Sequence, residues 1–187
     1  MTWAGLRAWR CTTLLRRVAR HAAEGEGFRC GDLSIAVVHS ARMAALHATH
    51  LGQPEPTDVL TFDLGTDIAA GRLDGEVVVC ADVAAAAAAA RGAPTRAGAH
   101  AELALYVVHG VLHLAGYDDQ TPAAFRRMHR REDELLAALG LGPVFSAAPS
   151  PTVARRLRRQ APVGPGRCGL RGAPGVRGFP LEQRPVL

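Results

Sequence analysis

The chain has 187 residues, enough for one sizeable hydrophobic core, and its hydrophobic content of 48% is typical of a globular protein. No apolar run reaches the roughly 18 residues that a membrane-spanning helix needs, so we expect no membrane segment. The four cysteines show no metal-ligand spacing and are too few for a disulfide scaffold, which favours free thiols in a reducing cytoplasm.

The net charge of +5 is unevenly distributed along the chain. Residues 1–146 contain 14 Arg against 16 Asp and Glu, a net charge of −2, whereas residues 147–187 contain 8 Arg and one acid, a net charge of +7. The basic character therefore belongs mostly to the C-terminal segment and is no evidence that the folded part binds nucleic acid.

The C-terminal segment, residues 146–187, is rich in Pro, Gly and Arg and has no hydrophobic period. This composition predicts disorder, because such a segment cannot bury enough apolar surface to fold. It is either a solvated extension or a weak electrostatic contact with RNA or the ribosome. We expect one folded domain over residues 1–145.

The predicted elements indicate an α/β (α+β) fold, a small mixed sheet flanked by helices. In chain order they are a helix over 9–22, a strand over 33–38, a helix over 40–50 capped by Ser40, strands over 59–64 and 76–80, and a helix from Asp82 through the alanines 84–90. Since a short loop joins the second and third strands, we expect them to pair antiparallel.

Two further helices follow. Thr95 is the predicted cap of a long helix that is apolar on most sides, which is typical of the central buried helix of a fold. Thr121 and Pro122 begin a last helix that continues to Leu139, because Pro is well suited to the first helical position.

The long buried helix carries two histidines, His109 and His113. Positions i and i+4 share a helix face, so both imidazoles can point at one ion. Gly116 then ends the helix, since glycine readily takes the left-handed geometry of a C-terminal cap. After this turn the chain can offer Asp118 or Asp119 as a third ligand, which predicts a catalytic zinc site with an open position.

The offsets favour Asp119 as the third ligand. Asp118 can instead accept a hydrogen bond from a ligand histidine or a backbone amide. Glu102 lies seven residues before His109 and shares its face. It is a supporting partner of the ligands, an anchor of the helix, or simply an exposed or ion-paired helix residue. His129 has no comparable spacing and is expected at the surface.

Metzincin metalloproteases place ligands and a glycine at the same offsets from the first histidine, +4, +7 and +10. They carry a glutamate as general base directly after that histidine, where this chain has Gly110. The absence of this base argues against a peptidase of the usual mechanism.

Residues 109–119 resemble the signature of the YbeY endoribonucleases, His-Gly-x-Leu-His-Leu-x-Gly-Tyr-Asp-His, except at the last position. Two other family elements are similar to residues 56–62 (Pro-Thr-Asp-Val-Leu-Thr-Phe) and residues 75–80 (Gly-Glu-Val-Val-Val-Cys). The resemblance covers roughly residues 30–140, with the three elements in family order and spacing.

The resemblance implies a zinc-dependent endonuclease, with one ion per chain, that cleaves single-stranded RNA in the cytoplasm. It further implies a role in the maturation of the 3′ end of 16S rRNA and in ribosome quality control, with the small ribosomal subunit as partner. The zinc ligands would be His109, His113 and Asp119, and Thr57 and Asp58 would position the substrate or a water molecule.

Three features depart from the family pattern. Asp119 replaces the third histidine and adds a negative charge, so a bound water should be less acidified than with three neutral ligands. Leu51 stands where the family usually has an arginine that holds phosphate, and the neighbouring His50 can only partly replace it. No N-terminal strand is visible before residue 9.

Two other functions stay open at this stage. One is a peptidase of metzincin-like geometry, against which Gly110 argues. The other is a ribosome-associated binding factor without catalytic activity, which would hold a structural zinc. A structural site should be closed by four protein ligands, and the sequence offers three.

Overall fold

The computed structural model describes residues 11–142, residue 144 and residues 185–186. Five helices are α1 (Thr12–Gly25), α2 (Ser40–Leu51), α3 (Ala81–Ala90), α4 (Arg96–Leu114) and α5 (Pro122–Ala138). The strands are β1 (Leu33–Val38), β2 (Val59–Asp63), β3 (Gly75–Cys80) and the two-residue β4 (Pro185–Val186). The predicted α/β class is confirmed.

The sheet is mixed, with the strand order β1-β3-β2-β4. β1 runs parallel to β3, and β2 runs antiparallel to β3, as the short connection between them predicted. β4 pairs antiparallel with Thr61 and Phe62 of β2. The remainder of the segment predicted to be disordered, residues 146–184 and 187, lies outside the described residues, as does the Trp9 end of the first predicted helix.

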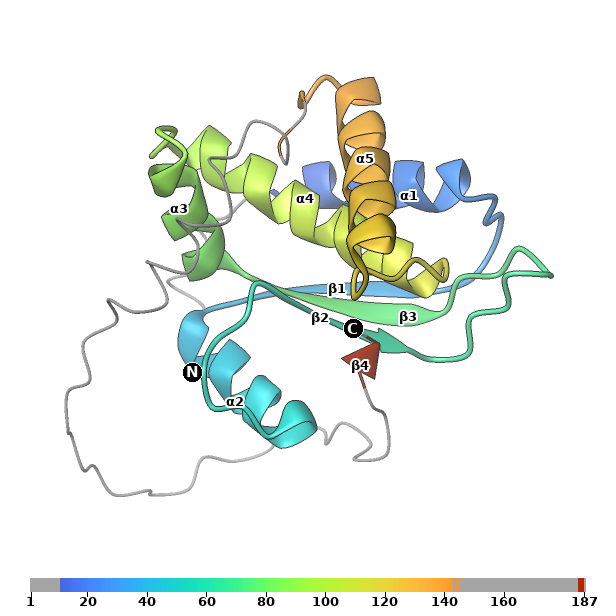
Figure 1. The fold of residues 1–187 in the computed structure, drawn as a ribbon, viewed down its shortest axis with the longest axis horizontal. Coiled ribbons are helices and arrows are strands. Elements are labelled where there is room, and N and C mark those ends of the chain that lie inside the picture. Colours follow the sequence, from blue (N-terminus) through green and yellow to red (C-terminus); the bar gives the residue numbers. More distant parts are fainter. Residues whose placement is uncertain (1–10, 143, 145–184, 187) are drawn as a thin grey trace.

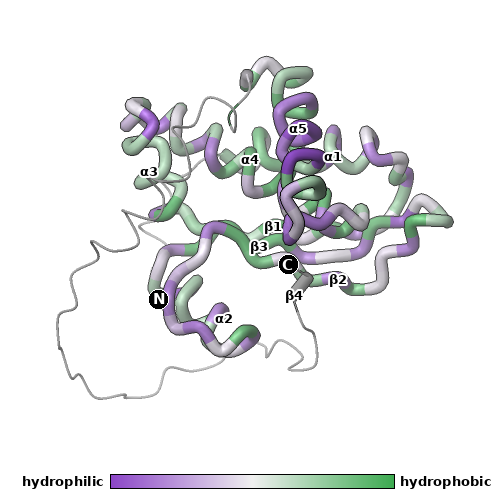
Figure 2. Tube along the Cα trace, in the orientation of Figure 1, coloured by the Kyte–Doolittle hydropathy of each residue, from purple (hydrophilic) through white to green (hydrophobic). Residues whose placement is uncertain are grey.

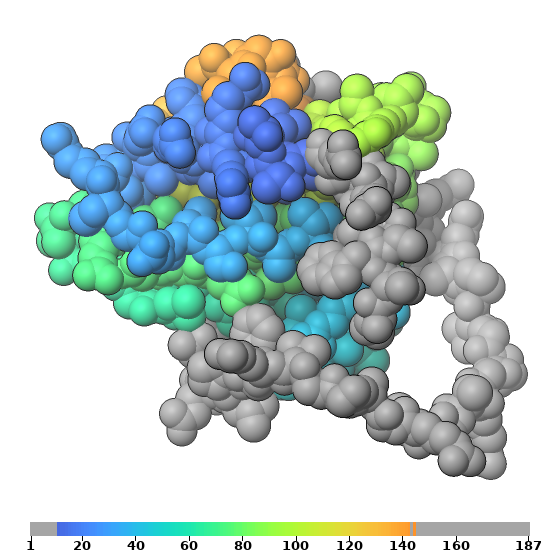
Figure 3. Space-filling model, turned by 180° about the vertical axis from the view of Figure 1, so that it is seen from behind, coloured from blue at the N-terminus to red at the C-terminus, as the bar shows by residue number. Residues whose placement is uncertain are grey.

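Helices cover both faces of the sheet (Figure 1). Helices α1, α3, α4 and α5 lie on one face, and α2 lies on the other. Seen from behind, α1 runs alongside the edge strand β1 (Figure 3), and both contribute residues to the cavity between them. Among the described residues, no helix combines the length and apolar character of a membrane span.

The alternation of side chains along β3 divides the core in two. Val77 and Val79 face the larger cluster, which is built on α1, α4 and α5, whereas Val78 and Cys80 face a smaller cluster with Met43 of α2. Figure 2 shows apolar residues concentrated on α3, α4 and the central strands, while α5 carries a long hydrophilic stretch. All of β3 is therefore apolar except for Gly75 and Glu76, because both of its faces are covered.

Helix α4 is the most deeply buried helix of this fold. Most of its side chains are buried, including Leu103 and Leu112, each of which stabilises the fold by about 1.5–3 kcal/mol through burial. The Thr95 side chain accepts a hydrogen bond from the backbone N–H of Gly98 (3.1 Å), as its predicted role as N-cap requires.

The start of α2 differs from its prediction. Ser40 is the first helical residue and does not cap the helix with its side chain. Its backbone N–H instead donates to the Asp82 carboxylate at the start of α3 (2.8 Å). A residue 42 positions away thus performs the capping, which local sequence patterns do not reveal.

Gly110 brings α4 close to the sheet. A Cβ atom there would lie 2.8 Å from the Thr61 hydroxyl of β2 and 2.8 Å from a Val77 methyl of β3. Position 110 therefore faces the sheet and has no room for a side chain, which explains why the glutamate of metzincins is absent here.

We predict that Gly110→Ala lowers the free energy of unfolding by about 1–3 kcal/mol, because the added methyl overpacks the interface between α4 and the sheet. Denaturant unfolding followed by circular dichroism measures this change. Ala97→Ser, at an exposed position of the same helix, is the control and should change the stability by less than about 0.5 kcal/mol. Equal stability of the two variants would contradict the close approach.

Candidate metal centre

The C-terminal end of α4 orients His113. Gly116 has a φ of +85°, its N–H donates to the carbonyl of His113, and the N–H of Tyr117 donates to the carbonyl of Leu112. This turn brings the Tyr117 carbonyl to 3.1 Å from Nδ1 of His113. Because a carbonyl oxygen only accepts, Nδ1 must carry the proton, and the Nε2 atom is left to face the site.

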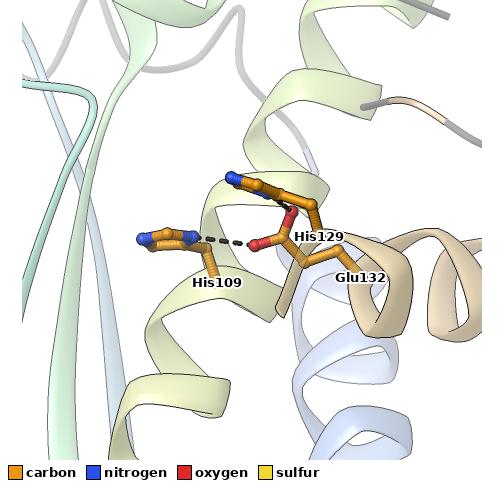
Figure 4. A group of neighbouring side chains, drawn as sticks. All are labelled: His109, His129 and Glu132. Carbon is orange, nitrogen blue, oxygen red and sulfur yellow. Dashed lines mark hydrogen bonds and ion pairs between the residues drawn. The ribbon is translucent and has the colours of Figure 1, made fainter. Parts of the chain in front are cut away.

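Helix α5 orients His109 in the same way. The buried Glu132 carboxylate accepts hydrogen bonds from Nδ1 of His109 (2.8 Å) and from Nδ1 of His129 (2.5 Å). Figure 4 shows Glu132 between the two imidazoles, one from α4 and one from α5. His109 therefore also presents its Nε2 atom to the site.

The two Nε2 atoms lie only 2.9 Å apart. With both Nδ1 atoms acting as donors, two neutral imidazoles would point their lone pairs at each other. A proton on His109 or a cation shared by both nitrogens removes this repulsion. The two imidazoles therefore favour a positive charge, either a proton or a metal ion, between their Nε2 atoms.

The electrostatics agree with this geometry. Burial lowers the pKa of His109, but the hydrogen bond and charge of Glu132 outweigh it and raise the pKa above its usual value. Burial and the neighbouring His109 charge lower the pKa of His113. Burial raises the pKa of Glu132, but hydrogen bonds from His109 and His129 bring it below its usual value, so the carboxylate is ionised. Without a metal, a proton between the two Nε2 atoms therefore binds His109 in preference to His113.

Asp119 lies next to the histidine pair, as its offset predicted. Its Oδ2 atom is 4.0 Å from Nε2 of His109, and one ligand atom each of His109, His113 and Asp119 lie within 4.8 Å of one another. Two imidazole nitrogens and a carboxylate oxygen suit a divalent transition metal such as zinc. The Asp118 carboxylate accepts from the backbone N–H of Gln120 (2.9 Å) and is not part of this group.

A cavity of about 430 Å³ opens onto the site. The cavity is lined by side chains from β2, α4, α5 and the loops beside them, including the residue that follows α3: Thr57, Asp58, Val59, Arg91, Leu105, Tyr106, His109, His113, Asp119, Phe125, His129 and Glu132. Thr57 and Asp58, which the family resemblance implied would position the substrate or a water molecule, are among these residues. The Asp58 carboxylate is held by the Thr57 hydroxyl and by the backbone N–H of Val59, both at 2.9 Å.

Glu102 is buried but serves a different partner. Its carboxylate lies 3.2 Å from Nε of Arg91, and it makes no hydrogen bond to His109 or His113. Burial raises the pKa of Glu102, and the Arg91 charge opposes this shift. Glu102 is therefore an ion-paired residue of the helix, and its carboxylate holds Arg91 at the cavity wall.

The prediction for His129 was wrong. Its side chain is only 11% exposed, and together with Glu132 it forms the support of His109 that spacing around the histidine pair did not reveal. A local signal existed, because His129 and Glu132 are three residues apart and share one face of the last predicted helix. Their partner His109, however, is 23 residues from Glu132 and is brought there only by tertiary packing.

Leu51 and His50 lie away from this cavity. Leu51 packs against the smaller core cluster on the α2 face of the sheet, and the His50 ring contacts Phe62 of the same cluster, with centroids 4.8 Å apart. Neither residue lines the cavity. His50 therefore does not take the place of the arginine that the family usually has at position 51.

The sequence is similar to known endoribonucleases. A family model described as "Endoribonuclease YbeY" matches residues 6–140. The protein of that name from Anaeromyxobacter sp. (strain Fw109-5) is 43% identical over 110 residues, which cover 59% of this chain and 55% of the relative. The protein of the same name from Halorhodospira halophila is 39% identical over 123 residues, which cover 64% of this chain and 75% of that relative. The chain thus spans little more than half the length of the first relative.

We predict that Glu132→Gln destabilises the metal-free protein by about 1–3 kcal/mol, mainly between pH 4.5 and 6.5. The raised pKa of His109 contributes stability that is complete below pH 6.5 and is lost as the pH rises through the folded-state pKa. The lowered pKa of Glu132 contributes stability above pH 4.5 that is lost as the pH falls. Both contributions are complete only between pH 4.5 and 6.5, and one of them is progressively lost on either side of this window.

Denaturant unfolding in the presence of chelator, from pH 4 to pH 9, measures this difference. Glu134→Gln, at an exposed position of the same helix, is the control and should show no such window. A wild-type advantage over Glu132→Gln that is the same at every pH would refute the charged pair of His109 and Glu132.

Proposed function

This chain belongs to the YbeY endoribonuclease family, and we propose that it is a metal-dependent hydrolase that cleaves the phosphodiester bonds of single-stranded RNA. His109, His113 and Asp119 would hold one zinc ion per chain. We assign this activity to one domain formed by residues 1–145.

The observation that carries the proposal is the pair of facing Nε2 atoms, 2.9 Å apart, whose Nδ1 atoms are already used by Glu132 and by the Tyr117 carbonyl. This is the arrangement that orients histidine ligands in metal enzymes. A divalent ion bound there would polarise a phosphoryl oxygen and lower the pKa of a water molecule. His109 is 18% exposed and Asp119 is 32% exposed, so the site faces the cavity, which favours a catalytic over a closed structural site.

The other residues of the cavity supply positioning. The Asp58 carboxylate, fixed by Thr57 and Val59, can accept a hydrogen bond from a water molecule or a ribose hydroxyl. Arg91, held by Glu102 and by the carbonyl of Val144, lines the same cavity and can donate to a phosphate. A fixed cation beside a metal site suits a phosphodiester better than a peptide.

The finer parts of the proposal concern the substrate. We infer that the RNA is ribosomal, that the cleavage contributes to maturation of the 3′ end of 16S rRNA and to ribosome quality control, and that the enzyme works in the cytoplasm on the small ribosomal subunit. The family resemblance supports these statements. The lack of space at Gly110 for a general-base glutamate argues against the peptidase alternative.

We predict that His113→Ala abolishes both stoichiometric metal binding and RNA cleavage, because it removes one of two nitrogens that face each other. Metal analysis of the purified protein and digestion of single-stranded RNA, beside casein, measure the two effects. His21→Ala on α1 is the matched control and should retain both. Full cleavage after exhaustive dialysis against chelator would refute the metal mechanism.

Asp119→Ala should weaken metal binding by more than about 10-fold, whereas Asp118→Ala should leave it nearly unchanged. The reason is that Asp119 completes the ligand group, while the Asp118 carboxylate accepts from the Gln120 amide. Competition with a chromophoric chelator gives the two affinities. The opposite order would assign Asp118 as the third ligand.

A further inference from the structure

One exposed aromatic ring stands out in the cavity. Among the described residues, three large hydrophobic side chains are exposed: Leu64, Ile68 and Phe125. Only Phe125, which is 39% exposed, lines the cavity that holds the histidine pair. An apolar ring kept in contact with water beside charged groups has no role in the core of the protein, which raises the question of what it contacts.

The ring of Phe125 packs against a second aromatic ring, that of His129. His129, one turn further along α5, meets it edge to face, with ring centroids 4.0 Å apart and planes at 74°. Glu132 fixes His129, and the same carboxylate fixes His109. His129 also stacks on His109, with centroids 6.1 Å apart and planes at 23°. The ring is thus tied to the metal ligands and held at a set place relative to them.

The surroundings of the ring indicate the chemistry of its ligand. A cavity of about 430 Å³ is within the range of roughly 300–1,000 Å³ that small-molecule sites occupy, so it takes about one nucleotide and not a duplex. Its Arg91 guanidinium is suited to a phosphate, and its exposed ring is suited to a flat group with apolar faces. A nucleotide with an unpaired base combines the two.

We propose that Phe125, backed by His129, is the stacking platform for one unpaired nucleobase of the RNA, next to the phosphate that is cleaved. This inference rests on the proposed endoribonuclease function and adds the residue that selects single strands. A base within a duplex is already stacked on its neighbours and cannot reach the ring, whereas every unpaired base has a π face to offer. The platform therefore discriminates strandedness and tolerates any base sequence.

The test uses the full-length, metal-loaded protein and short single-stranded RNAs. Phe125→Leu should lower kcat/KM by about 5- to 150-fold, the range that corresponds to the loss of one base–aromatic stack. Phe125→Trp should stay within about 3-fold of wild type, since it keeps a ring. Ile68→Ala, an exposed apolar position outside the cavity, is the matched control and should not change kcat/KM.

A second experiment removes the nucleobase of the RNA instead of the Phe125 ring. A set of RNAs carries an abasic nucleotide at each position near the cleavage site in turn. At one of these positions, removal of the base should lower the kcat/KM of wild type as much as Phe125→Leu lowers it on the intact RNA. The kcat/KM of Phe125→Leu should be the same for the RNA that is abasic at that position and for the intact RNA. A 2-aminopurine placed there should be quenched on binding to wild type and Phe125→Trp, and not on binding to Phe125→Leu.

The outcomes separate the two proposals. If wild type cleaves RNA and Phe125→Leu cleaves it equally well, the stacking platform is refuted and the proposed function stands. If Phe125→Leu and Phe125→Trp lose activity equally, and wild type stays more active than both on every abasic RNA, Phe125 has only a structural role. If wild type neither binds nor cleaves RNA with metal supplied, the proposed function itself fails, and the platform with it.

Discussion

The site depends on two imidazole Nε2 atoms held 2.9 Å apart, with their lone pairs directed at each other. Neutral rings in this position repel, so the arrangement persists only with a proton or a metal ion between them. Both outer nitrogens are already committed, one to the buried Glu132 carboxylate and the other to the Tyr117 carbonyl. The surrounding fold holds the two nitrogens at this short distance, and the metal chemistry we propose follows from it.

Three separate structural features supply that constraint. The glycine turn after α4 returns the chain so that a backbone carbonyl meets His113. The docking of α5 brings a buried carboxylate to His109. The absence of a side chain at Gly110 lets α4 lie directly on β2 and β3, which fixes the helix while its histidines face the cavity. A rigid helix between two supports can hold functional side chains within about 0.5 Å of a productive position.

The same supports organise the cavity for a substrate. Glu132 connects His109 to His129 and, through the contact between rings, to the exposed Phe125. On another wall, the buried Glu102 holds Arg91. Buried carboxylates thus position the two groups that we assign to the base and the phosphate of RNA. Each carboxylate has a cationic or hydrogen-bonding partner, without which its burial would strongly destabilise the fold.

Local patterns in the sequence were sufficient for the five helices, the strands β1, β2 and β3, the antiparallel pairing of β2 with β3, the Thr95 cap, and the proximity of His109, His113 and Asp119, because each depends on residues close together in the chain. Tertiary structure alone decided the capping of α2 by Asp82, the pairing of Glu102 with Arg91, and the support of His109 by Glu132. These contacts join residues on different elements, and no helical or strand period relates them. The proximity of the three candidate ligands was therefore predictable from spacing, whereas the contact of His109 with Glu132 depends on how α5 packs against α4.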